Sequence, residues 1–199
     1  MAGSCGAAFI DANVMVRAWT MDVMLSLAEA GMFEPLWSKF VLDEAHEALL
    51  GLRPQAESQI VSYLSAVQRS NSYACVPESE FAVVVPDLPD PDDGHVVAAA
   101  AGGGAKWVVT YNLRDFPAGI LAPLGLKPIL PDAFLCMLFS CDGSLAVATM
   151  RRLVADKRRP PRTMAEELAG LRRNGLANFA AALEEAFAEE AGAERGGAS

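Results

Sequence analysis

Short apolar segments alternate with helical segments along the first 140 residues, and this alternation constrains the fold more than any other feature. The apolar runs 7–10, 107–110 and 128–130 have the length and composition of buried strands. The stretches between them space their apolar residues as helices do. Such an alternation favours an α/β fold with a central parallel sheet covered on both faces. Helices are expected at 19–30, 40–50, 55–70, 96–101 and 131–139, a weaker strand at 34–37, and a β-rich segment at 81–85.

The chain changes character at Asp142, after which only helical segments follow. A helix capped by Asp142 or Ser144 is expected to run to Asp156, and a basic, proline-broken linker follows it. Thr163 and Glu166 form the capping-box pattern of a second helix. A last helix is expected to end at about 190. We therefore divide the chain into a domain at 1–140, a helical extension at 141–191 and a disordered tail at 192–199.

The composition is that of a globular protein with a hydrophobic core. Hydrophobic residues make up 52% of the chain, and the mean hydropathy is +0.23. No apolar run is long enough to span a bilayer, and the N-terminus lacks the pattern of a secretory signal. The four cysteines form no closely spaced pair, so we read them as reduced thiols. These features predict a cytoplasmic protein that does not use a membrane.

The charge is distributed unevenly. Residues 1–140 carry the whole net charge of −9, whereas residues 141–199 are neutral overall and contain a basic stretch at 145–173. This distribution does not suit a general nucleic-acid coat. It is compatible with an acidic metal site and a separate surface that contacts phosphate. The candidates for that surface are Arg151, Arg152, Arg158 and Arg159, although arginines on a helix are more often solvated.

Acidic and amide side chains gather around the segment 88–117. Asp92 and Asp93 lie where a helix is expected to begin, and Asn112 and Asp115 follow the strand that ends at Thr110. Open α/β sheets bind their ligands beyond the carboxyl ends of the strands. The residues around this segment are therefore expected to lie near one another.

Four carboxylates could share this edge of the sheet, namely Asp11, Glu44, Asp93 and Asp115. The spacing does not decide between Glu44 and Glu47. Like charges held together repel, and a divalent cation relieves the repulsion. Oxygen ligands favour Mg²⁺ or Mn²⁺ over zinc, and such an ion can activate water for attack on a phosphodiester. Taken singly, each aspartate is also explained as a cap of a helix or strand, and His95 as a solvated or packed helix residue.

Four segments resemble the motifs of PIN-domain ribonucleases of the VapC-like toxin type: 9–14, 37–44, 88–100 and 108–117. The helices after 141 resemble the C-terminal extension of one branch of that family. The resemblance implies a three-layer α/β/α fold and metal-dependent endonucleolytic cleavage of RNA phosphodiesters with Mg²⁺ or Mn²⁺. It also implies an antitoxin partner, as in type II toxin–antitoxin pairs, and commonly a homodimer.

By motif, the resemblance makes Asp11, Glu44, Asp93 and Asp115 the metal ligands and catalytic residues. Asn13, Thr110, Asn112 and Asp92 would support them, and the tail arginines would guide RNA. Many relatives carry aspartate where this chain has Asn112, so either Asn112 or Asp115 completes the site. Two other functions stay open. One is a non-catalytic interaction module with the same fold, and the other is an aspartyl phosphotransfer protein, which would need an aspartate at Asn13.

Overall fold

The structure is a computed structural model that describes residues 4–81, 84–158 and 160–196 of the 199. The chain divides into two compact units. The sheet unit comprises Gly6–Ala18 and Phe33–Leu130. The helical unit comprises the residues before Gly6, Trp19–Met32 and the chain from Pro131 onward. Each unit is described by itself below.

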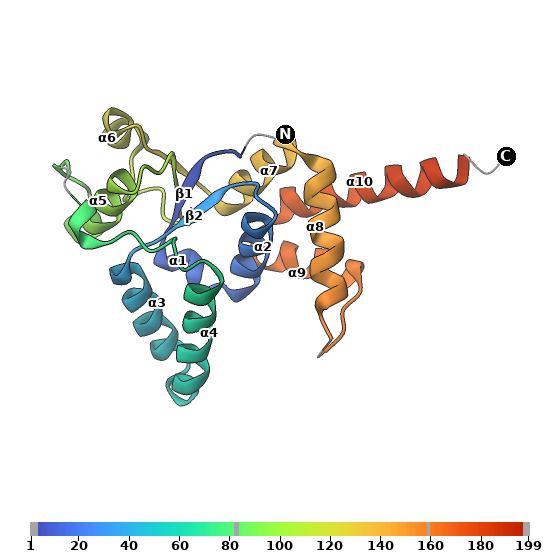
Figure 1. The fold of residues 1–199 in the computed structure, drawn as a ribbon, viewed down its shortest axis with the longest axis horizontal. Helices are drawn as coiled ribbons and strands as arrows, with labels where there is room; N and C mark the ends of the chain where they lie inside the picture. The colour runs from blue at the N-terminus through green and yellow to red at the C-terminus, as the bar shows by residue number, and fades with distance from the viewer. Residues whose placement is uncertain (1–3, 82–83, 159, 197–199) are drawn as a thin grey trace. The chain divides into compact units, whose positions relative to one another are not determined.

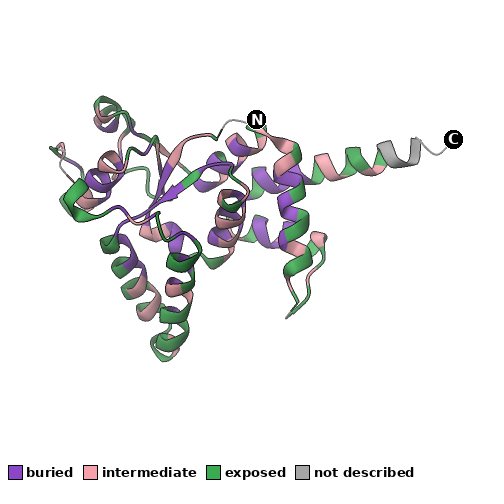
Figure 2. Ribbon diagram, in the orientation of Figure 1, coloured by how far each residue is buried: buried purple, intermediate pink, exposed green. Residues whose placement is uncertain are grey.

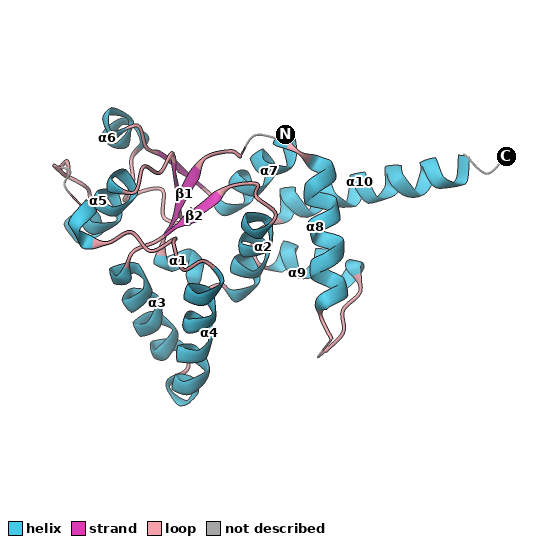
Figure 3. Ribbon diagram, in the orientation of Figure 1, coloured by secondary structure: helices cyan, strands magenta, loops and turns pink. Residues whose placement is uncertain are grey.

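A four-stranded parallel sheet forms the centre of the sheet unit (Figures 1 and 3). Its strands lie in the order β2-β1-β3-β4, and Phe9 pairs with Leu36 on one side and with Val108 on the other. The predicted parallel sheet flanked by helices is thereby confirmed, as is the edge position of β4. The bounds are Ala7–Ile10 for β1, Glu34–Leu36 for β2, Trp107–Val109 for β3 and Lys127–Ile129 for β4.

The middle strands are buried because they are apolar on both faces. Ala8, Phe9 and Ile10 have no exposed surface, and neither have Val108 and Val109 (Figure 2). A buried backbone must satisfy its polar groups within the sheet. The strand ends are consequently fixed with respect to one another, and so are the polar residues that follow them.

Helices of the sheet unit begin and end largely where the sequence predicts. Ser38 caps α3 by accepting the Val41 N–H at 3.2 Å, and α3 and α4 lie side by side as a hairpin (Figure 1). A short helix, α1, follows β1 directly and was not predicted. The helices are α1 (Ala12–Met15), α3 (Lys39–Leu52), α4 (Glu57–Ser70), α5 (Gly94–Gly102) and α6 (Ala118–Leu121), with 3₁₀ turns at Pro54–Ala56, Glu78–Glu80, Pro91–Asp93 and Ala122–Leu124.

The glycines that end α5 serve two different needs. Gly104 has φ +70°, which favours glycine, as expected for a helix stop. Gly102 instead packs against the chain that precedes the site, since a Cβ there would lie 2.0 Å from the Glu80 carbonyl oxygen. The predicted β-rich segment 81–85 is wrong for its described residues, which are not in a strand, and residues 82–83 lie outside the described chain.

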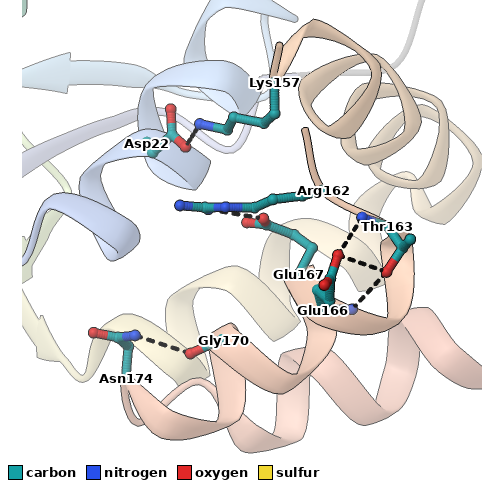
Figure 4. A network of polar contacts seen from close by, with 8 residues as sticks. All are labelled: Asp22, Lys157, Arg162, Thr163, Glu166, Glu167, Gly170 and Asn174. Carbon is teal, nitrogen blue, oxygen red and sulfur yellow. Dashed lines mark hydrogen bonds and ion pairs between the residues drawn. The ribbon is translucent and has the colours of Figure 1, made fainter. Parts of the chain in front are cut away.

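In the described part of the helical unit, the secondary-structure elements are helices (Figure 3). Asp142 caps α8 through the Leu145 N–H, and Thr163 and Glu166 form the predicted capping box of α9 (Figure 4). Asp132 accepts the N–H groups of Asn178 and Phe179 at the start of α10. The helices are α2 (Ala18–Glu29), α7 (Pro131–Cys141), α8 (Gly143–Asp156), α9 (Met164–Arg173) and α10 (Ala177–Gly196).

The division into units differs from the domains expected at 1–140 and 141–191. The contacts group α2 with the C-terminal helices and start the C-terminal part at Pro131. Helix α10 continues to Gly196, past the predicted end at about 190, and residues 197–199 of the expected tail lie outside the described chain. Packing between segments that are distant in sequence decides such boundaries. The helical pattern of α2 does not show which of the two units the helix packs in.

No single helix in the described chain has the length and apolar composition of a membrane span. Helices α7 and α8 have that length and composition only when they are taken together, and the pair is bent by 117°. The four cysteines are free thiols.

Candidate active site

Asp11, Asn13 and Thr110 form one hydrogen-bonded group at the carboxyl ends of β1 and β3. Thr110 Oγ1 donates to Asp11 Oδ2 at 2.7 Å, and Asn13 Nδ2 donates to Asp11 Oδ2 at 2.5 Å and to Thr110 Oγ1 at 2.9 Å. The Asp11 N–H also donates to the Val109 carbonyl, which joins the two strand ends. The group depends on the parallel pairing of β1 with β3, because that pairing brings residues far apart in sequence to one edge.

Asp11 is buried, with 5% of its surface exposed. Burial raises the pKa of its carboxyl above 3.8, because an ionised group loses hydration there, while the hydrogen bond from Thr110 opposes the shift. Glu44 raises this pKa further by its negative charge, and His95 lowers it. Asp11 is thus a carboxylate whose ionised form depends on its neighbours.

Glu44 projects from α3 toward the start of α5, where its Oε1 lies 2.8 Å from His95 Nε2. The hydrogen bond to Glu44 raises the pKa of His95, and burial opposes that shift. The His95 ring also lies 5.6 Å, centroid to centroid, from the ring of Phe40. Glu47 is exposed on the same helix and is not among the charges that act on Asp11 or Asp93. The structure therefore brings Glu44 to the site.

Asp93 ends the 3₁₀ turn Pro91–Asp93 and stands at the start of α5. Its pKa rises from 3.8 to about 6. Burial is the largest cause, and the charges of Asp11, Asp115, Asp90 and Glu44 add to it in that order. The other three predicted carboxylates, Asp11, Asp115 and Glu44, therefore all act electrostatically on Asp93. The neighbouring Asp92 is exposed, and its N–H is held by Asp90 Oδ1 at 3.0 Å.

Asn112 and Asp115 face each other in the loop after β3. The Asn112 amide donates to Asp115 Oδ2, and the Asn112 N–H donates to Thr110 Oγ1 at 2.9 Å. Only Asp115 of this pair carries a charge, and that charge acts on Asp93. Both candidates for the last ligand are thus near the site, with the amide positioning the carboxylate.

The chemistry of these donors fits a divalent cation. The four side chains offer oxygen atoms only, which suits Mg²⁺ and Mn²⁺. Burial raises the pKa of Asp93 most, and the nearby carboxylates add repulsion that a cation would relieve. Within the described residues, no three His, Cys, Asp or Glu side chains are already close enough to hold a metal ion. Asp11, Glu44 and Asp115 are each engaged by a hydrogen-bonding neighbour instead.

The tail arginines that were predicted to contact RNA are largely engaged within the helical unit. Arg151 pairs with Glu190, and Arg152 lies 3.5 Å from Glu29. Arg158 forms an isolated backbone bridge with Pro161, and Arg159 lies outside the described residues. Their role in binding RNA stays a prediction.

Sequence reasoning missed two features of the site. His95 was interpreted as a solvated or packed helix residue, although its place two residues after Asp93 was a usable signal for the contact with Glu44. The second feature is the contact between Arg17 and Tyr111, which are brought together by the β1–β3 pairing. No pattern in the sequence relates those two residues.

Comparison with protein families agrees with the fold. The family model described as PIN domain matches residues 7–114, more than half of the chain, and includes Asp11, Glu44 and Asp93. It ends one residue before Asp115. The family model described as VapC50 C-terminal domain matches residues 131–185. Searches of curated proteins and of solved structures found no match.

Proposed function

The chain belongs to the PIN-domain family, and we propose that it is a divalent-metal-dependent endoribonuclease, the toxin of a type II toxin–antitoxin pair. The observation that carries the proposal is the electrostatic coupling of the four carboxylates. Burial raises the pKa of Asp93 most, and the charges of Asp11, Asp115 and Glu44 raise it further. A structural cap needs no such concentration of negative charge, whereas a site for a cation does.

Asp11, Asp93, Glu44 and Asp115 would hold Mg²⁺ or Mn²⁺. The bound ion would supply positive charge to the phosphate and lower the pKa of a water. That water would attack phosphorus while the P–O3′ bond breaks, which leaves a 5′-phosphate and a 3′-hydroxyl. PIN-domain proteins generally use divalent metal ions, and the choice between these two is part of the proposal.

The neutral residues of the site would keep the carboxylates in position. Thr110 and Asn13 both donate to Asp11 Oδ2, and the backbone N–H of Ala12 also hydrogen-bonds the Asp11 carboxylate, so three neighbours fix its orientation. His95 orients Glu44, and Asn112 orients Asp115. Fixing the ligands before the substrate arrives reduces the cost of assembling the site.

The test is cleavage of total bacterial RNA with Mn²⁺, with Mg²⁺ and with EDTA, read by sequencing the new 5′-phosphate ends. Asp11→Asn should abolish cleavage. The chain offers a matched pair on α3, since Glu44→Gln should lower the rate by at least about a hundredfold, while Glu47→Gln should cleave as wild type does. Equal loss in both variants, or cleavage by Asp11→Asn, would contradict the assignment.

A non-catalytic module of the same fold is the second candidate, and one observation favours it. Among the described residues, the side chains that could bind a cation are hydrogen-bonded to neighbours and are not gathered around one metal position. Calorimetry with Mn²⁺ separates the two, because a module without a metal site would release no binding heat at millimolar metal. Aspartyl phosphotransfer has less support, since the position that needs aspartate is Asn13, whose amide is engaged with Asp11, Thr110 and Tyr111.

The partners and location follow from the same proposal. The free cysteines suit the reducing cytoplasm. An antitoxin protein and a homodimer stay predictions from the family resemblance. Co-expression with the gene that neighbours this one, followed by co-purification, would test the first.

A further inference from the structure

Arg17 and Tyr111 form a stacked pair beside the carboxylates. Arg17 follows α1, and its guanidinium carbon lies 4.1 Å from the centroid of the Tyr111 ring. Arg17 is exposed and Tyr111 is partly buried. A guanidinium stacked on an aromatic face keeps its N–H groups in the plane parallel to the ring, where they can bind an anion.

Both members of the pair are tied to the residues that hold Asp11. The Tyr111 N–H donates to Asn13 Oδ1 at 3.0 Å, and Asn13 also binds Asp11 and Thr110. The Arg17 N–H donates to the Val14 carbonyl at 3.0 Å, so the arginine continues the turn that begins at Asp11. The backbone that carries Arg17 and Tyr111 is therefore joined to the turn that carries the first carboxylate.

The guanidinium has no ion-pair partner in the described part of the chain, although the sheet unit is strongly acidic. Four arginines of the tail differ, since Arg151, Arg152, Arg162 and Arg172 are each paired with a glutamate. An arginine held by stacking rather than by a carboxylate keeps its charge and its donors available. Planar bidentate donors are the groups that proteins use most for phosphate.

We propose that Arg17 binds a backbone phosphate of the RNA next to the one that is cut, and that Tyr111 is the positioning residue that holds Arg17 in place. This inference rests on the proposed ribonuclease function. It assigns the phosphate contact to the sheet unit, in addition to the basic tail. Because backbone phosphates carry no base identity, the contact adds affinity and register without sequence preference.

Steady-state cleavage of a labelled single-stranded RNA substrate, found among the cut sites mapped above, tests the proposal. Arg17→Ala should raise KM about tenfold and change kcat by less than about threefold, because the lost contact binds substrate and transition state alike. The slope of log KM against log salt should fall by about 0.7, the value for one phosphate on a single strand. Arg17→Lys should restore part of the affinity, because it keeps the charge without the planar fork.

Variants of the ring separate positioning from a general loss of structure. Tyr111→Leu should raise KM in the wild-type background and add nothing to Arg17→Ala, while Tyr111→Phe, which retains the aromatic ring, should raise KM less than Tyr111→Leu does. Arg53→Ala is the matched control, an exposed arginine nine residues beyond Glu44, about 13 Å along the helix axis. It should leave KM and the salt slope unchanged.

The outcomes distinguish this inference from the function on which it rests. Cleavage by wild type but not by Asp11→Asn, together with an unchanged KM and salt slope in Arg17→Ala, overturns the subsite and leaves the ribonuclease intact. If wild type does not cleave, the ribonuclease fails, and anisotropy of a labelled single-stranded RNA of mixed sequence with Mn²⁺ decides the subsite. Equal binding by wild type and Arg17→Ala, or no binding, overturns it. If Arg17→Ala loses binding to an acidic antitoxin segment but still binds RNA as wild type does, the phosphate contact is overturned and Arg17 is assigned to the antitoxin.

Discussion

The guanidinium of Arg162 lies over the indole of Trp19, with its carbon 3.9 Å from the ring centroid. The same side chain reaches Glu167 with its Nη1 3.2 Å from Oε2, and Glu167 has no exposed surface (Figure 4). A buried carboxylate is costly unless it is paired, and here one arginine provides the pair while covering an aromatic face. This contact joins α2 to the C-terminal helices within the helical unit.

Arg162→Ala should destabilise the protein by about 3–5 kcal/mol, because it leaves Glu167 buried without its cation. Arg172→Ala is the matched control, since its partner Glu184 is exposed and such surface pairs contribute about 1 kcal/mol or less. Chemical denaturation of both variants gives the comparison. Similar losses in the two would show that burial of Glu167 does not decide the effect.

Gly170→Ala should destabilise the protein by about 1–3 kcal/mol, although alanine is the better helix former. A Cβ at this position would lie 2.0 Å from Cζ2 of Trp19. The Trp19 ring cannot move away freely, because the Arg162 guanidinium packs over it. Gly192→Ala in α10 meets no atom within 4 Å and should be neutral or slightly stabilising. Thermal unfolding measures both, and equal melting temperatures would contradict the close approach.

Thr110→Val should weaken Mn²⁺ binding about tenfold and cost about 1–3 kcal/mol in stability. The hydroxyl donates to Asp11 and accepts from Asn13 and from the Asn112 N–H, so valine leaves several polar groups unsatisfied. The loss also raises the pKa of Asp11 further, since this hydrogen bond lowers it. Thr110→Ser should recover metal affinity in calorimetry. Thr149→Val, at a buried threonine of α8, should leave that affinity unchanged.

The stability of the metal-free protein should fall as the pH rises from about 4 to 6, in part through Asp93. Its folded pKa of about 6 exceeds the ordinary 3.8, so in this window the native protein retains a proton that the unfolded chain has lost. The stabilisation is therefore complete below pH 3.8 and lost above about 6. Asp93→Asn removes this contribution and should raise the melting temperature at pH 7 in EDTA.

The comparison of wild type with Asp93→Asn isolates this residue from the other titrating groups. Asp92→Asn serves as the control, since Asp92 is exposed and is not among the main charges that raise the pKa of Asp93. Melting temperatures from pH 4 to 8 in EDTA should converge for wild type and Asp93→Asn at the acid end and separate above pH 6. Parallel curves would show that Asp93 is not desolvated by its surroundings.

Much of the local structure could be predicted because it depends on neighbouring residues. Ser38, Asp142 and Thr163 cap the helices that follow them, and the capping box of Thr163 is formed as its spacing predicts. The apolar run at 7–10 forms β1 with the predicted bounds. The segment 81–85 was misread because β-branched residues suit a strand only where a neighbouring strand is available to pair with them.

The sequence by itself determined the alternation of strands and helices, the family, and the carboxylates that the strand ends would carry. It could not choose between Glu44 and Glu47, because helical spacing puts both on one side and only the packing of α3 against the start of α5 brings Glu44 to His95. The stack of Arg17 on Tyr111 and that of Arg162 on Trp19 were likewise decided by the tertiary structure. Caps and periodicity act over a few residues along the chain. Contacts between distant segments depend on strand register and helix packing, which no local pattern encodes.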